Sequence, residues 1–508
     1  MSTERRADPD DHARTGGHAP SGVPVAPEGS AAPVEPAITA GRPSAAAPVK
    51  ARPGPLGANY WRLFASATMT NLGDGLMTVA VVWLASTLTR EPTLIALVGL
   101  ASRLPWLLFS LPAGVITDRY DRRVLVASMD VARVVLIAAF TAVLALHQSG
   151  LPHPEALAAG TEGPPESAGL LLTMLVLLAL LLGCCEVVRD NSAQTLMASV
   201  VTKDHLERAN GRLWGAETAM NNFVGPPLAG VLIAIALVWP FLSSAVLLAA
   251  GVLLVVSLRG SFRPKGQVAS GRIRWRTEMG EGLRWLWRHR LLRTLALVLG
   301  GMNMLSAIAF VLMVLFAQEV LGLFQGWQYG AVITGVAVGA VIGSLVADRI
   351  AKALTPGISL FAAIGVEAAT FTAIGLTSSA VLVWLAGVLS GVAIILWNVI
   401  TVSLRQRIIP DQLLGRVNSV YRFFGWGTIS LGTLLGGVLV SAGEPFLGRE
   451  WALRLPFLLA GAAYLVLLAL ALPRLSTAKI AAAQAAAEAE APGETPETRA
   501  ADAPGGET

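Results

Sequence analysis

Twelve long apolar runs fill the chain between residues 61 and 472. A helix needs about 20 mostly apolar residues to cross the roughly 30 Å hydrocarbon core of a bilayer, where no water satisfies backbone polar groups. We therefore predict an all-α membrane protein with twelve transmembrane helices, which agrees with a composition of 54% hydrophobic and 14% charged residues. The runs lie at residues 61–88, 92–116, 124–146, 168–188, 213–238, 241–258, 291–320, 327–350, 356–377, 380–404, 417–441 and 451–472.

The loops between these runs alternate between basic and nearly charge-free. Lys and Arg follow the even-numbered runs, whereas residues 147–167 after the third run carry Glu and neither Lys nor Arg. Cytoplasmic loops carry the excess of Lys and Arg in membrane proteins. We therefore expect a multi-pass protein of the cell membrane with both termini in the cytoplasm. The net charge of +5 lies in these loops and not along one soluble face, which argues against nucleic-acid binding.

The composition changes at both ends of the chain and in its middle. Residues 1–57 and 476–508 are rich in Ala, Pro, Gly, Glu and Thr, so we predict disordered cytoplasmic tails. Residues 58–258 and 291–475 would each form a six-helix bundle. The linker 259–290 is rich in Arg and Trp, and we expect it to contain an amphipathic helix on the inner membrane surface, attracted to anionic lipid.

An internal repeat relates the two halves. Three pairs of segments match in the same order, namely 117–119 with 347–349, 204–210 with 411–418, and 225–230 with 432–437. Repeats of this kind predict two pseudo-symmetric bundles with the substrate path between them.

Two of these segments also resemble known signatures. Residues 114–123, Gly-Val-Ile-Thr-Asp-Arg-Tyr-Asp-Arg-Arg, resemble the loop signature of the major facilitator superfamily, with Asp121 in place of its second Gly. Residues 225–230, Gly-Pro-Pro-Leu-Ala-Gly, resemble its antiporter signature in the fifth helix, with Ala229 in place of a Gly. The resemblance extends over residues 61–472 and implies the major facilitator fold.

Within the superfamily, residues 206–210 and 275–290 look most like the drug:proton antiporter branch of macrolide-efflux and enterobactin exporters. That resemblance implies a secondary active transporter that works by alternating access. It also implies a monomer that exchanges a small-molecule substrate for protons, with membrane lipid around it.

Charged side chains inside the runs are the candidates for proton coupling, because such groups are costly in lipid. Asp74 lies on a polar face of the first helix with Thr70 and Thr78, and Arg103 of the second helix lies at about the same depth. We hypothesise an ion pair between Asp74 and Arg103 in which the carboxylate takes up and releases a proton. A static structural pair is the alternative. Two further candidates are Glu217 and Glu367.

The superfamily-like loop predicts a cytoplasmic gate, with a plain topology signal as the alternative reading. We expect the gate to include a charged group at the end of the fourth helix, which would meet the Asp118 loop. The gate candidates are Gly114, Asp118, Arg119, Arg122, Arg123, Glu186, Arg189 and Asp190. Gly225, Pro226 and Gly230 belong to the fifth-helix motif, and its Gly225-Pro226-Pro227 segment is expected to break the backbone ladder and bend the helix.

Polar and aromatic side chains inside the runs are candidates for the substrate cavity, and ordinary packing is their alternative role. They are Asn71, Trp106, Asn221, Asn303, Trp397 and Asn398.

The sequence therefore predicts proton-coupled efflux of a small amphipathic compound, such as a drug, an antibiotic or a siderophore-like molecule. Uptake of a small nutrient is the first alternative, and a non-transporting sensor or scaffold is the second. We expect neither an enzyme nor an ATP-driven pump, and no cofactor or metal, since the sequence has no Gly-x-x-x-x-Gly-Lys-Ser/Thr loop and no metal-ligand spacing.

Overall fold

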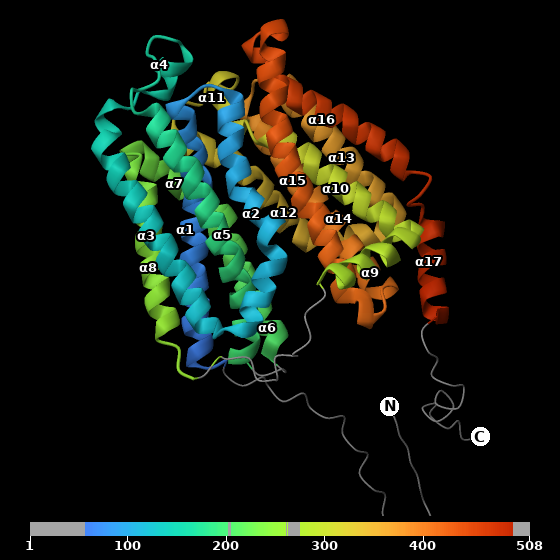
Figure 1. Ribbon diagram of the computed structural model, residues 1–508. Helices are drawn as coiled ribbons and strands as arrows, with labels where there is room; N and C mark the ends of the chain where they lie inside the picture. The colour runs from blue at the N-terminus through green and yellow to red at the C-terminus, as the bar shows by residue number, and fades with distance from the viewer. Residues whose placement is uncertain (1–55, 202–204, 261, 263–274, 491–508) are drawn as a thin grey trace, which may run out of the picture. The chain divides into compact units, whose positions relative to one another are not determined.

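The computed structural model describes residues 56–201, 205–260, 262 and 275–490 (Figure 1). The segments predicted to cross the membrane are helical. Twelve helices in these ranges are long and apolar enough to cross a membrane, which confirms the predicted number and the all-α fold class. The disordered tail predicted at residues 1–57 lies almost wholly outside the described residues.

The spans of the first half are formed by α1 Ala58–Leu88, α2 Pro92–Arg119, α3 Arg122–His147, α5 Ala168–Val200, the broken helix α6 Leu206–Thr218, η3 Ala219–Val224 and α7 Gly225–Ile235, and α8 Val238–Val256. The spans of the second half are α10 Arg290–Phe310 with α11 Met313–Glu319, α12 Gly326–Leu354, α13 Pro356–Leu376, α14 Ala380–Ile408, α15 Asp411–Leu447 and α16 Arg449–Ala471. The other helices are η1 Gln148–Gly150, α4 Pro154–Ala158, α9 Trp275–Arg288 and α17 Thr477–Glu490.

The helix contacts of one half recur in the other. In the first half α2 packs on α5 and α3 packs on α8, and in the second half α12 packs on α14 and α13 packs on α16. Between the halves α2 contacts α15, and α7 contacts α12. Helices α2 and α12 are the second spans of their halves, and α7 and α15 belong to the fifth spans, so these two contacts are equivalent, as the sequence repeat leads one to expect.

The two ends of the helices carry different loops. Helices α4 and α11 lie at one end, which we call the α4 end, and α6 and α9 lie at the other (Figure 1). The second end also holds the turn between α2 and α3 with its three arginines, Arg119, Arg122 and Arg123. We call it the basic end.

Helix α5 is longer than predicted, and α17 was not predicted. Helix α5 runs to Val200 instead of residue 188, and its last turns are helical although their sequence is polar. Helix α17 covers residues assigned to a disordered tail, and that assignment is wrong for Thr477–Glu490. Ala has the highest helix propensity, and Ile480 is buried, since α17 packs on α13 and α14.

Helix α9 lies in the linker, where an amphipathic helix is predicted. It contacts α10 and α15, and Leu286 is fully buried. The ring of Trp287 stacks on Phe424 of α15, with 6.4 Å between centroids. The apolar face of α9 therefore packs at least partly on the second half.

Glycines set the close approach of α12 and α14. Gly335, Gly339 and Gly343 recur every four residues on α12 and face Gly387 and Gly391 of α14. A Cβ added at Gly391 would lie 2.7 Å from the backbone N of Ala340. Small residues at this spacing let helix backbones approach closely in lipid, where dispersion contacts drive association.

Candidate functional site: a buried charge cluster in the first half

Asp74 of α1 forms an ion pair with Arg133 of α3. The side chain of Arg133 is 4% exposed and that of Asp74 is 18% exposed. The sequence predicts Arg103 of α2 as the partner of Asp74, whereas the structure pairs Asp74 with Arg133 of α3. Arg103 has interactions of its own and lies within electrostatic range of Glu186.

The pair continues into a chain of charges that crosses three helices. The guanidinium of Arg133 lies 3.4 Å from Asp130 on α3, and the Nε of Arg189 on α5 lies 3.6 Å from the same carboxylate oxygen. Arg189 also donates a hydrogen bond of 2.9 Å to Asp190. Asp130 is fully buried. We call Asp74, Asp130, Arg133, Arg189 and Asp190 the charge cluster.

The sequence predicts Arg189 and Asp190 at a helix end beside the Asp118 loop. That position is wrong, because α5 continues for ten residues beyond Asp190 to Val200. Both residues therefore lie inside the helix, and Arg189 reaches α3, where it forms an ion pair with Asp130.

Two more carboxyl groups lie near the charge cluster. Glu186 is one turn before Asp190 on α5 and interacts electrostatically with Asp74 and Arg133. Glu217 of α6 interacts with Arg189 and Asp190. Carboxyl groups therefore outnumber guanidinium groups around the cluster, and an unpaired charge is costly in a low-dielectric interior.

Glycines on α1 fix the backbone that carries Asp74. A Cβ added at Gly73 would lie 2.6 Å from Leu248 of α8, and one added at Gly75 would lie 2.8 Å from the carbonyl oxygen of Asn221. Asp74 thus sits between two residues that must be small for α1 to pack against α8 and η3.

The α-helical ladder of the fifth span is interrupted, but the chain stays helical. A π-helical segment, η3, precedes Gly225 and the two prolines. An added Cβ at Gly225 would lie 2.6 Å from the Cα of Gly75 on α1, and one at Gly230 would lie 2.5 Å from the Cα of Trp327 on α12. Gly225 and Pro226 therefore follow the change of helix type, and Gly230 packs α7 of the first half against α12 of the second.

The basic gate candidates bind backbone carbonyls within the first half. Arg122 donates to the carbonyl of Thr195 on α5, at 3.3 Å. Arg123 donates to the carbonyl of Leu258 after α8, at 2.7 Å. Arg119 is exposed. These contacts hold the α2–α3 turn against the basic ends of α5 and α8.

Asp121, which replaces the second Gly of the loop signature, has a local structural role. Its carboxylate accepts hydrogen bonds from the backbone N–H groups of Arg123 and Val124, at 2.9 and 3.3 Å. It is thus the N-cap of α3. Gly114 and Asp118 belong to α2, but their side chains lie outside the described structure.

The two halves are joined at the α4 end by a network around Arg90. Arg90 follows α1 and donates to the side chain of Gln318 at 2.5 Å, and its Nε lies 3.4 Å from Glu319 of α11. Arg449 of α16 binds Glu319 at 2.7 Å and the carbonyl of Arg90 at 2.8 Å. Burial lowers the pKa of Arg90, whereas Glu319 acts in the opposite direction. We call Arg90, Gln318, Glu319 and Arg449 the α4-end lock.

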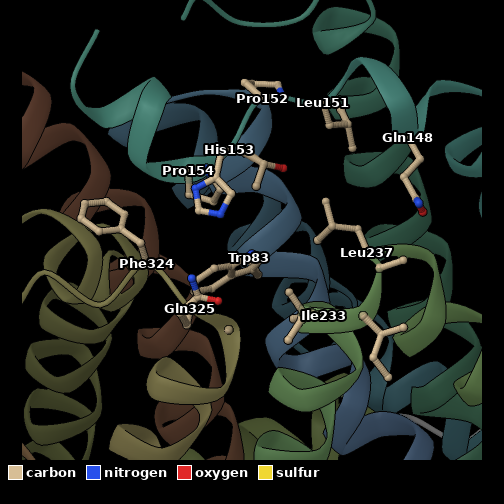
Figure 2. Close-up of a pocket in the computed structure, with 15 residues that line it drawn as sticks. Trp83, Gln148, Leu151, Pro152, His153, Pro154, Ile233, Leu237, Phe324 and Gln325 are labelled. Atoms are coloured by element: carbon tan, nitrogen blue, oxygen red, sulfur yellow. The ribbon is translucent and has the colours of Figure 1, made fainter. Parts of the chain in front are cut away.

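A pocket of about 330 Å³ lies beside this lock, between the halves. Figure 2 shows Trp83 and Ile233 from the first half and Phe324 and Gln325 from the second, with His153 above them. Apolar and polar groups of both halves thus meet at this pocket.

The cavity candidates fall into different places. Asn71 and Asn221 come together, with 3.5 Å between the amide nitrogen of Asn221 and the side-chain oxygen of Asn71. Asn303 donates to the carbonyl of Gly425 on α15, at 3.1 Å. Asn71 lies on α1, three residues before Asp74, and Asn221 lies on the neighbouring η3. Both are therefore near the charge cluster.

The remaining candidates include one correction. Trp397 is 2% exposed and belongs to the packed core, so it lines no open space in this structure. Trp106 is half-buried and has contacts of its own, and Asn398 is exposed and donates to the carbonyl of Ile394 at 3.0 Å.

Glu367 lies apart from the charge cluster. It is 1% exposed on α13, and both oxygens of its carboxyl group lie within 3.0 Å of the Ser390 hydroxyl on α14. It therefore belongs to the packing of the second half.

Sequence reasoning missed Asp130 and Arg133. The available signal was two opposite charges three residues apart within an apolar run, which places them on one face of a helix. A charged pair inside a span is as costly as a single Asp and should have been weighed with Asp74.

Solved transporter structures share this fold. A point mutant of the nucleoside transporter NupG has a TM-score of 0.63 at 12% identity and covers 82% of this chain and 100% of its own. A bacterial homologue of the iron transporter ferroportin, inward-facing, has a TM-score of 0.59 at 17% identity, covering 81% and 98%.

A bacterial homologue of the human lysosomal transporter Spinster, inward-facing and unoccupied, has a TM-score of 0.56 at 16% identity, covering 85% and 95%. No curated protein matches the chain. The family model of the Major Facilitator Superfamily matches residues 63–433. With twelve spans in two halves and this match over most of its length, the chain belongs to the Major Facilitator Superfamily and is a multi-pass membrane transporter.

Proposed function

We propose that this protein is a proton-coupled exporter of a small amphipathic compound in the cell membrane, with the basic end and both termini in the cytoplasm. The observation that carries the proposal is the ion pair between Asp74 and Arg133 inside a membrane-spanning bundle. A charged residue at that depth is expensive, and it persists where it serves a substrate or ion pathway.

Proton coupling would use the imbalance of charge around the cluster. Arg133 is shared between Asp74 and Asp130, so it can keep one partner when the other is protonated. Asp74 is the more exposed of the two carboxylates and is therefore the one that water reaches. In this scheme protonation of Asp74 breaks its ion pair with Arg133. When Asp74 is then exposed to the other side of the membrane, its carboxyl group releases the proton there.

Alternating access would use the contacts between the halves. The α4-end lock closes that end through Arg90, Glu319 and Arg449, and Gly230 lets α7 and α12 touch. The basic residues at the other end favour a cytoplasmic position, since cytoplasmic loops carry the excess of Lys and Arg. The structure is then the state closed on the outer side. The α2–α3 turn, held by Arg122 and Arg123, would form the inner gate in the opposite state.

Direction and substrate class rest on the resemblance of residues 206–210 and 275–290 to the exporter branch, and on that of residues 225–230 to the antiporter signature. The sparse polar groups along the path, chiefly Asn71, Asn221 and Asp74, suit an amphipathic compound better than a strongly hydrated nutrient.

The test is transport in inside-out vesicles with an imposed proton gradient and a panel of dyes and antibiotics. We expect the gradient to drive accumulation by the unaltered protein and by Glu162→Gln, a control in an exposed loop. Asp74→Asn should abolish gradient-driven accumulation while still folding, because Arg133 keeps Asp130 at 3.4 Å.

Two outcomes would overturn the proposal. Substrate movement that ignores the gradient would show uniport, and accumulation only in right-side-out vesicles would show uptake. An Asp74→Asn variant as active as the control would move the proton to another carboxyl group, of which Glu217 is the next candidate.

A further inference from the structure

A basic pocket of about 660 Å³ lies at the basic end between the start of α10 and α17. Arg288, Arg290 and Arg293 line it from one side, and Arg474 and Lys479 line it from the other. None of the described lining residues is acidic. The two groups come from distant parts of the chain, so the fold brings their charges around one space.

The hydrogen bonds described for three of these side chains go to uncharged carbonyl groups. Arg474 donates to the carbonyl of Leu470 at 2.7 Å, and Lys479 donates to the carbonyl of Pro473 at 2.6 Å. Arg293 donates to the carbonyl of Trp287 at 3.2 Å. Carbonyl groups orient the cations but carry no net charge. An anion in the pocket would therefore gain attraction from several cations at once.

The pocket lies at the depth of lipid headgroups. The candidate membrane span of α10 begins at Arg290, and that of α16 ends at Ala471. Two large apolar side chains lie within two residues of pocket residues in the sequence, and both Trp287 and Leu472 are 47% exposed. Trp is favoured at the interface between headgroups and acyl chains. The site thus combines cations with an apolar border.

We propose that this pocket binds the phosphate group of an anionic phospholipid, with the acyl chains lying along the apolar border. Basic pockets between membrane helices bind such headgroups. The positive-inside tendency alone accounts for basic loops, but not for five cations gathered around a cavity by two segments. The exposed apolar border favours a lipid over a soluble phosphate, which would need only the cations.

The experiment measures the thermal unfolding of the purified full-length protein in detergent during titration with short-chain lipids. The probes are phosphatidylglycerol, phosphatidylcholine with the same acyl chains, and inorganic phosphate. The test variant is Arg474→Gln with Lys479→Gln. The matched control is Arg349→Gln with Lys352→Gln, which removes the same two charges from exposed positions of α12 outside the pocket.

We expect phosphatidylglycerol to stabilise the unaltered protein and the control at lower concentration than phosphatidylcholine does. The Arg474→Gln, Lys479→Gln variant should bind phosphatidylglycerol about 30-fold more weakly, because it loses two cations, each of which contributes about 1 kcal/mol. Equal loss in both double variants would mean a general surface attraction and would overturn the site. Saturation by inorganic phosphate with no preference for phosphatidylglycerol would make it a site for a soluble anion and would overturn the lipid assignment. Because the readout is binding, it is independent of whether the protein transports protons.

Discussion

Arg90 offers a direct test of the α4-end lock. The change is Arg90→Ala, which removes the hydrogen bond to Gln318 at 2.5 Å and the ion pair to Glu319 at 3.4 Å. The side chains of Arg90 and Glu319 are 15% and 13% exposed, so the pair is partly screened by water. A hydrogen bond to a charged group contributes about 1.5–3 kcal/mol. These contacts join the two halves, and we expect them only while the α4 end is closed.

That energy sets the size of the effect. A loss of about 1.5–3 kcal/mol from the closed state alone shifts the balance toward the open state about 10- to 100-fold. The closed state keeps the hydrogen bond from Arg449 to the backbone carbonyl of residue 90, at 2.8 Å, so some preference remains. The variant should therefore open the α4 end more often without unfolding.

The assay is the rate at which a thiol reagent reaches a reporter cysteine. Thr87→Cys places the reporter at a site that is 1% exposed and lines the pocket between the halves. Cys184 and Cys185 are first replaced by Ser to remove other thiols. We expect labelling of Thr87→Cys to become at least about tenfold faster with Arg90→Ala.

Glu444→Gln is the matched control. Glu444 binds Arg449 at 2.9 Å, but both residues belong to the second half, so this change should leave the balance of states nearly unaltered. Unchanged labelling in Arg90→Ala, or an equal increase in Glu444→Gln, would refute the idea that cross-half contacts of Arg90 hold the α4 end closed.

Two further predictions concern stability, each measured by thermal unfolding in detergent. Gly391→Ala should lower the free energy of unfolding by about 1–3 kcal/mol, because its new Cβ would lie 2.7 Å from the backbone N of Ala340. The control Gly365→Ala should be tolerated, since its Cβ would meet only Leu468, at 4.0 Å. Equal unfolding temperatures of the two variants would contradict the close packing of α12 and α14. Arg133→Gln should cost about 3–5 kcal/mol, since it leaves buried Asp130 and Asp74 without their shared guanidinium. Adding Asp130→Asn should recover part of this loss, and no recovery would argue against the pairing.

The sequence predicted the number of spans because each apolar run alone is long enough to cross a bilayer. The same criterion missed the end of α5. Residues beyond Val188 continue the helix, but they are too polar to be recognised as part of a membrane span. Helix α17 was missed because its Ala-rich composition also fits a disordered chain, and only burial of Ile480 decides for a helix.

The candidate site could be found only in part. Asp74 was recognised from its polar neighbours on one face of α1, a local property of the sequence. Its partner Arg133 was missed, because the rotation of α3 against α1 decides which side chains meet and no helical periodicity specifies it. The burial of Trp397 likewise depends on which face of α14 meets its neighbours.

The charge cluster also has a consequence for how the protein is made. A charged residue near the centre of a lone helix costs about 2.5–3.5 kcal/mol on entering the membrane. Asp74 enters first, with α1, and meets Arg133 only when α3 follows, while Arg189 arrives last, with α5. The growing chain therefore has to hold unneutralised charge in or near the bilayer until α5, its fourth span, is in place. A substitution of Arg133 should accordingly reduce the amount of protein that reaches the membrane before it affects the transport of any molecule.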